Sequence, residues 1–263
     1  MSSLLKYFKL WAKLTAYSFM VSLTSRFNAI VFFIGKLFRF LFFAIFLLAL
    51  FSQTKTIAGY NAREIVFFFL TFNFIDTVTQ LFFREVYRFR PLVVSGNFDL
   101  VLVKPISPLF RALAGGADPL DLFMLVPYIG AIIYVGLFLT KFSLPAILLY
   151  LLLLVNSFLI ATGFHVLVLS LAVVTTEIDH TIMIYRDLTS MGRVPVDIYR
   201  EPLRLILTFI IPVGIMMTIP AKAFFGLIAP GFAVVTFTVG LTFLYFSVKL
   251  WRFALSRYSS ASS

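Results

Sequence analysis

The sequence predicts an all-α integral membrane protein with six transmembrane helices. The chain has 263 residues, of which 61% are hydrophobic and 13% charged, about half the charged share of a soluble domain. Its apolar residues form six long runs, and most of its basic residues fall between those runs. This spacing is a topology signal and does not resemble the clustered basic patch of a nucleic-acid-binding protein, so no nucleic-acid partner is expected.

An amphipathic helix is expected at the N-terminus, within residues 1–26. At helical spacing Lys6, Lys9 and Lys13 share one face. The opposite face is apolar and comprises Leu4, Tyr7, Phe8, Trp11 and Leu14. A helix of this kind lies in the headgroup plane with its lysines toward anionic lipid, although the segment also fits the start of the first span. It has no small-residue cleavage site after a compact apolar core, so a cleavable signal is not expected.

A helix needs about 20 residues, within a range of about 17 to 25, to cross the hydrocarbon core of a membrane, and each of the six predicted spans has at least the lower number. They are residues 31–51, 65–83, 122–140, 144–174, 203–219 and 231–251. The fourth is too long for one upright crossing, so it tilts, kinks near Asn156 or Gly163, or extends into water. The fifth is short and carries Pro212, and the apolar stretch 220–230 after it is either a re-entrant helix or a buried outer loop.

Both termini and the second and fourth inter-span loops are predicted to be cytoplasmic. These regions hold sixteen lysines and arginines, including Arg186, Arg193, Arg200 and Arg204 in or next to the fourth loop. The alternate loops hold only Lys55, Arg63, Lys141 and Lys222. Basic residues concentrate on the cytoplasmic side. The sequence therefore predicts one transmembrane domain, residues 27–258, and a disordered Ser-rich tail, residues 259–263.

Several polar side chains are predicted to lie inside the membrane, where they usually face partners or water. Lys36 and Arg39 lie in the first span. The second span carries a stripe at helical spacing, formed by Asn73, Asp76, Thr77 and Gln80. Since these two spans form an antiparallel hairpin, Arg39 and Asp76 reach one depth, and we predict an ion pair between them. In the alternative, Lys36 and Arg39 snorkel to the headgroups and Asp76 bonds locally.

No catalytic site or metal site is predicted. The chain has no Cys and no P-loop, H-E-x-x-H or G-x-S-x-G motif, so it cannot cradle ATP in the P-loop manner and binds no cofactor of its own. His165 is interpreted as a packing group in the fourth span. Glu177, Asp179 and His180 lack a second histidine at ligand spacing and fit a solvated or partner-contacting helix end.

The segment 84–113 is a basic loop punctuated by Pro and Gly. We expect the second span to continue as a helix to Ser95, with Gly96 at the left-handed position that ends it. Residues 97–99 then turn the chain, an apolar run follows, and Ser107 begins a further short helix with Pro108 in its first turn. An apolar strip bracketed by Arg and Lys is suited to docking a soluble partner.

The same loop resembles that of type-2 ABC exporter permeases, through GNFDLVLVKP at 96–105 and PLFR at 108–111. A six-span bacterial branch of this family is also similar at GRVPVDIY, 192–199, at LRLILTFIIP, 203–212, at Pro220-Ala221, and at the closing RYSSASS. Each motif alone is loose, but their order and the topology match.

This resemblance implies a half-transporter in the bacterial inner membrane. Two permease copies, identical or related, would flank a path, and a separate ABC ATPase dimer holding ATP and Mg would bind below. The loop between spans two and three would carry the coupling helix, and Gly96, Asp99, Lys104 and Pro105 map onto it. The expected activity is outward movement of an amphipathic or lipid-like substrate. The alternatives are a secondary transporter or channel, or an intramembrane enzyme; the same loop can also be a solvated connector.

Overall fold

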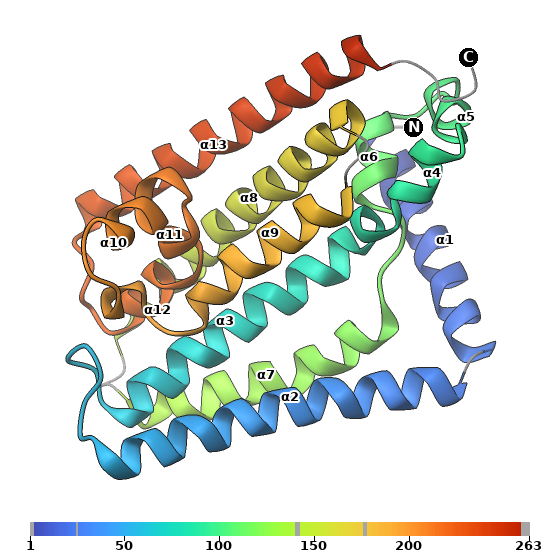
Figure 1. The fold of residues 1–263 in the computed structure, drawn as a ribbon. Helices are drawn as coiled ribbons and strands as arrows, with labels where there is room; N and C mark the ends of the chain where they lie inside the picture. Colours follow the sequence, from blue (N-terminus) through green and yellow to red (C-terminus); the bar gives the residue numbers. More distant parts are fainter. Residues whose placement is uncertain (1–2, 25, 140–142, 176–177, 259–263) are drawn as a thin grey trace.

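The structure is a computed structural model, and it describes residues 3–24, 26–139, 143–175 and 178–258. Within these ranges the chain is helical and contains no extended strand (Figure 1). The α-helices are α1 Ser3–Thr24, α2 Arg26–Gln53, α3 Ala62–Phe83, α4 Arg90–Val94, α5 Phe98–Leu102, α6 Pro108–Leu113, α7 Pro119–Leu137, α8 Leu144–Thr175, α9 Ile178–Ser190, α10 Leu203–Leu205, α11 Val213–Met217, α12 Ile219–Phe224 and α13 Pro230–Arg257. Between them lie η1 Arg84–Arg88, η2 Met191–Arg193, η3 Val196–Ile198 and the π-helical turn η4 Ile206–Ile210.

Five helical segments of the described chain are long and apolar enough to cross a membrane, where six were predicted. They are Ile30–Gln53, Ala62–Val94, Pro119–Leu137, Leu144–Thr175 and Pro230–Arg257. Each overlaps a predicted span. The second runs past Phe83 because η1 and α4 extend α3. The serine-rich tail 259–263 lies outside the described residues.

The predicted span 203–219 is not a continuous helix. It consists of α10, η4 and α11, and Pro212 and Pro220, which lack the backbone N–H that a helix interior needs, stand at the breaks. Arg204 near its start and Lys222 just beyond its end both form salt bridges to Asp197, at 2.9 and 2.7 Å. Because its two ends meet at one residue, this segment doubles back instead of crossing the bundle. Together with the buried helix α12 it forms a helical hairpin.

The crossing that replaces it begins with α9. At the start of α9, Asp179 pairs with Arg90 of α4 at 3.2 Å, whereas Asp197 accepts a hydrogen bond from Tyr60, in the α2–α3 loop, at 3.0 Å. The chain therefore travels from the end of the bundle that holds residues 84–113, the loop end, to the opposite end, the far end. In Figure 1, α9 runs beside α8, and a cavity lined by side chains of both α9 and α3 lies between those two helices. Hydropathy missed this helix because charged side chains interrupt its apolar face.

The prediction that the fourth inter-span loop lies at the same end of the bundle as the 84–113 loop is therefore wrong. Arg186 and Arg193 lie along the crossing, and Arg200 and Arg204 lie at or near the far end with Asp197. The loop end therefore holds fewer basic residues than predicted. It still holds more than the far end, because the basic N-terminus, 84–113 loop and C-terminus all lie there. Both termini lie at that end, where Lys6 Nζ donates to the Pro105 carbonyl oxygen at 2.7 Å. The Tyr258 ring also packs on Phe98 there, at 5.3 Å between centroids.

Helix α1 crosses the loop end of the bundle (Figure 1). Its Tyr7 hydroxyl accepts from the Ser107 backbone N–H at 3.1 Å, and Trp11 stacks on Phe82 at 5.6 Å between ring centroids. Thr15 Oγ1 accepts from the Ala117 N–H at 3.1 Å. The predicted N-terminal helix is thus present and tied to the bundle, while its place in the headgroup layer stays a prediction.

The most extensive packing joins α8 to α13. Helix α8 is continuous through Asn156 and Gly163, where a kink had been one option. Asn156 instead donates to the Thr236 carbonyl oxygen at 3.0 Å, and Gly163 lets the helices approach closely. Small residues serve this purpose in membrane helices, which gain little from hydrophobic burial.

Gly163→Val is expected to destabilise the fold. A Cβ at this position would lie 2.7 Å from Cδ1 of Phe243 and 3.4 Å from Cα of Leu244, so α8 and α13 would have to move apart. Overpacking of this kind costs about 1–3 kcal/mol. Thermal unfolding of the purified chain in mild detergent measures the loss. Gly130→Val is the matched control, since nothing lies within 4 Å of that Cβ position; equal loss in both variants would contradict the assigned packing.

Candidate functional site

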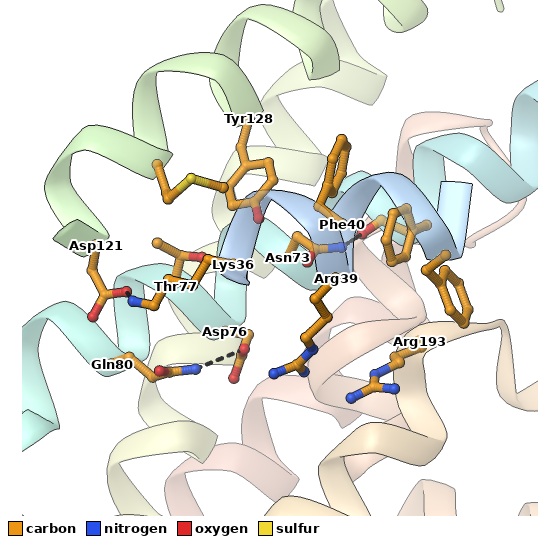
Figure 2. A pocket seen from close by; sticks show the side chains of 13 residues that line it. Lys36, Arg39, Phe40, Asn73, Asp76, Thr77, Gln80, Asp121, Tyr128 and Arg193 are labelled. Atoms are coloured by element: carbon orange, nitrogen blue, oxygen red, sulfur yellow. Dashed lines mark hydrogen bonds and ion pairs between the residues drawn. The ribbon is translucent and has the colours of Figure 1, made fainter. Parts of the chain in front are cut away.

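A polar cavity of about 100 Å³ lies inside the bundle, between α2, α3, α7 and η2. Figure 2 shows its polar side chains pointing into one space. The lining comprises Lys36, Arg39, Phe40, Phe43, Phe69, Asn73, Asp76, Thr77, Gln80, Asp121, Met124, Tyr128 and Arg193. The predicted intramembrane residues Arg39, Asn73, Asp76 and Gln80 are therefore brought together.

A second cavity, of about 440 Å³, adjoins this one. The two share the side chains of Arg39, Asp76, Gln80 and Arg193. The second is completed largely by α9, through Met183, Arg186, Asp187, Thr189 and Ser190, together with Phe72 and Tyr87 of α3 and η1. A polar route thus follows the crossing that sequence hydropathy did not identify.

The predicted Arg39–Asp76 ion pair is not formed, although both side chains line the cavity. Asp76 instead accepts a hydrogen bond from Gln80 Nε2, one turn along α3, at 2.8 Å, so the local-bonding alternative describes it better. Asn73 also bonds within its helix, to the Phe69 carbonyl oxygen at 2.7 Å. Arg39 points into the cavity beside Arg193 (Figure 2), which departs from the snorkelling alternative. The prediction considered only the hairpin of the first two spans. The Arg193 guanidinium, which comes from η2, shares the same cavity and repels Arg39.

An ion pair that the sequence did not reveal joins Lys36 of α2 to Asp121 of α7. The Asp121 side chain is 3% exposed and that of Lys36 is 28% exposed. Asp121 lies in the first turn of α7, after Asp118 and Pro119, where an acidic residue is common for local reasons. Only the packing of α7 against the centre of the bundle gives this residue its partner.

A second ionic cluster closes the far end around Asp197. Its carboxylate binds Arg204 and Lys222 and accepts a hydrogen bond from Tyr60. Burial, and then the nearby Asp197 carboxylate, raise the pKa of Tyr60 well above its ordinary value, so its hydroxyl stays protonated as a donor. This cluster ties the hairpin formed by residues 203–224 to the α2–α3 loop.

Asp197→Asn is expected to loosen the far end. The change removes the charge that holds Arg204 and Lys222 together, and the Lys222 and Asp197 side chains are only 15% and 11% exposed. Losing one partner of such a group costs about 2–4 kcal/mol. Limited proteolysis of the chain in detergent should show faster cleavage between residues 200 and 230. Asp187→Asn, on an exposed position of α9, is the control; unchanged cleavage in Asp197→Asn would contradict the role of the cluster.

The segment 84–113 folds into a compact surface at the loop end. Gly96 has φ of +72° and ends α4, and Ser107 caps α6 with Pro108 in its first turn, both as predicted. Two details differ. The expected helix 84–95 is divided into η1 and α4, and the expected turn at residues 97–99 already begins α5.

This surface has a buried side and an exposed apolar side. Phe98 and Val101 of α5 are 0% and 5% exposed and pack into the core, whereas Leu100 and Val103 are 60% and 79% exposed. Four residues were mapped to coupling. Lys104 and Pro105 are exposed, and Gly96 makes the turn after α4. Asp99 lies beside Tyr258, and the pKa of Tyr258 is raised by burial and then by the Asp99 carboxylate.

The environment of His165 is that of a packing residue and not of a reactive one. His165 is 1% exposed, bonds to the Ala161 carbonyl oxygen in its own helix at 2.8 Å, and is surrounded by the rings of Phe83, Tyr87 and Tyr185. In the part of the chain that the structure describes, no three His, Asp or Glu residues gather to hold a metal ion. Glu177 lies outside that part.

Apolar helices around a polar cavity, with a structured surface at one end, define a polytopic membrane protein whose interior can take a polar group. A model of the family described as ABC-2 family transporter protein matches residues 37–262. The chain belongs to this family, so it is a permease-type membrane component of an ABC transporter. No match was found among curated proteins or among solved structures.

Proposed function

We propose that the chain is the permease subunit of an ATP-driven exporter and that its 84–113 surface receives a separate ATPase. The exposed apolar side of α5, flanked by Lys104, carries this proposal. An apolar patch rimmed by charge at the end of a membrane domain is suited to a soluble partner. The partner would hold ATP and Mg, because this chain has no motif for them.

The loop is connected to the cavity in a way that suits transmission of movement. Helix α3, which carries Asp76 and Gln80, continues through η1 directly into α4. Two ion pairs brace this continuation: Arg111 of α6 with Glu85 at 2.6 Å, and Arg84 with Asp118 at 3.5 Å. A displacement of α5 and α6 would therefore move the inner part of α3, and with it one wall of the cavity.

The loop end is proposed to face the cytoplasm of a bacterial cell, with both termini on that side. The N-terminal lysines, the basic 84–113 loop, and Lys249, Arg252 and Arg257 of α13 support this orientation. We also propose a second permease copy, identical or related. Helix α2 leaves a row of large apolar side chains exposed and Arg39 accessible from one side, so another subunit would complete the wall of the route.

Co-purification and transport test this function. The tagged chain, expressed in its own host and extracted in mild detergent, is expected to bring down an ABC ATPase. Inverted vesicles should take up an amphipathic substrate only with ATP, and a partner whose P-loop lysine is replaced should abolish uptake. Uptake that follows an ion gradient without ATP, with no ATPase recovered, would support a secondary transporter and contradict the proposal.

A further inference from the structure

Two arginines share the central cavity, and neither forms a salt bridge there with a described residue. Arg39 of α2 and Arg193 of η2 both extend into the space beside Asp76 (Figure 2). Among the described residues, neither forms a salt bridge, and Arg193 only lies over the ring of Phe72, 6.0 Å from its centroid. The two guanidinium groups repel each other, and Arg186 adds to that repulsion.

The acidic side chains nearby do not balance this charge. Asp121 is paired with Lys36, whereas Asp76 accepts a hydrogen bond from the uncharged Gln80 amide and keeps its charge. Asp187 lines the wider cavity but is exposed. The remaining charges around the two cavities are therefore three positive ones, on Arg39, Arg186 and Arg193, and two negative ones, on Asp76 and Asp187. Cations at membrane depth are costly unless they meet a partner, so an oxyanion entering this space would relieve the repulsion.

We propose that Arg39 and Arg193 form a binding site for the phosphate or carboxylate headgroup of an anionic amphiphile. This rests on the proposed function, because it assigns a substrate class to the same route. Guanidinium groups donate in a planar fork that matches both oxyanions. The cavities are lined largely by polar and charged side chains, which suit a headgroup and not an alkyl chain, and Phe40 and Phe43 of α2 form an apolar part of the lining. The tail would then lie along the exposed aromatic face of α2, which includes Phe38 and Phe42, between this chain and the proposed second copy.

Asp76 gives the site an opposing charge of its own. Its carboxylate lines both cavities beside the two arginines, where it attracts Arg193 and repels an incoming anion. Removing this charge is expected to strengthen anion binding. An unfolded or misassembled variant could not produce that gain, so the Asp76 substitution separates a binding effect from a loss of structure.

Ligand titration of the purified full chain, with its ATPase when that co-purifies, tests the site. The probes are dodecyl phosphate, the zwitterion dodecylphosphocholine with the same tail, and inorganic phosphate, each titrated in a neutral maltoside detergent and followed by microscale thermophoresis. Dodecyl phosphate is expected to bind about tenfold more tightly than either of the others. Arg39→Gln and Arg193→Gln should each weaken it about tenfold, Arg252→Gln on the exposed end of α13 should not, and Asp76→Asn should strengthen it severalfold.

Equal affinity for the two amphiphiles, unchanged affinity in both arginine variants, or weaker binding in Asp76→Asn would overturn the site. Inorganic phosphate binding as tightly as dodecyl phosphate would overturn the amphiphile and leave only an ion site. Failure of this inference is distinguishable from failure of the proposed function. Absent binding with the ATPase still attached refutes the headgroup site alone, whereas intact binding without any ATPase refutes the exporter.

Discussion

Asp121→Ala is expected to lower the free energy of unfolding by about 3–5 kcal/mol. The substitution leaves Lys36 without its partner at a depth where an uncompensated ammonium is costly, and it removes a carboxylate whose side chain is 3% exposed. Helix α2 makes few other contacts with the bundle, so this pair is its main polar tie to α7. Thermal unfolding in mild detergent should show a fall in Tm of ~10 °C, with aggregation visible on size-exclusion chromatography.

A double-variant cycle separates the pair from the individual side chains. Lys36→Met alone strands Asp121 and should cost about as much as Asp121→Ala. Lys36→Met with Asp121→Leu removes both charges and should recover most of the stability, since an apolar pair of similar volume replaces a buried ion pair at little cost. Additive losses in the double variant would show that the two side chains do not depend on each other.

The long apolar helices could be predicted because length and hydropathy are local properties. Helix α9 could not, because Arg186 and Asp187 face the polar route and lower the hydropathy of a segment that nonetheless crosses the bundle. For the segment 203–219 the error was the opposite one, since hydropathy predicted a span that the structure does not have. An apolar run with Pro212 fits a short span or a buried hairpin equally well, and only the shared contact of Arg204 and Lys222 with Asp197 distinguishes them.

The site was predictable in its depth but not in its pairing. Helical spacing in one hairpin was enough to bring Arg39 and Asp76 to the same level. Which partners they take depends on Gln80 on one side and on Arg193, more than a hundred residues away, on the other. Asp121 was missed for the same reason, since nothing near it in sequence indicates that α7 packs beside Lys36.

Leu100→Asp combined with Val103→Asp is expected to abolish ATP-driven transport while leaving the permease folded. Both side chains are largely exposed, at 60% and 79%, so the fold loses little packing. In the proposed complex they would be covered by the ATPase, and burying two unpaired carboxylates there costs several kcal/mol. The ATPase recovered with the tagged permease should fall at least about tenfold, measured by quantitative immunoblotting of mild-detergent eluates.

Two further variants decide what such a loss means. Ser256→Asp adds one carboxylate to an exposed position of α13 at the loop end and should leave ATPase recovery unchanged. Phe98→Ala removes a fully buried ring that packs against Phe89, Trp251 and Tyr258, so it should lower both stability and ATPase recovery. Normal ATPase recovery and transport in the Leu100→Asp, Val103→Asp variant would exclude this face of α5 as the contact. The ATPase would then have to bind another part of the loop end.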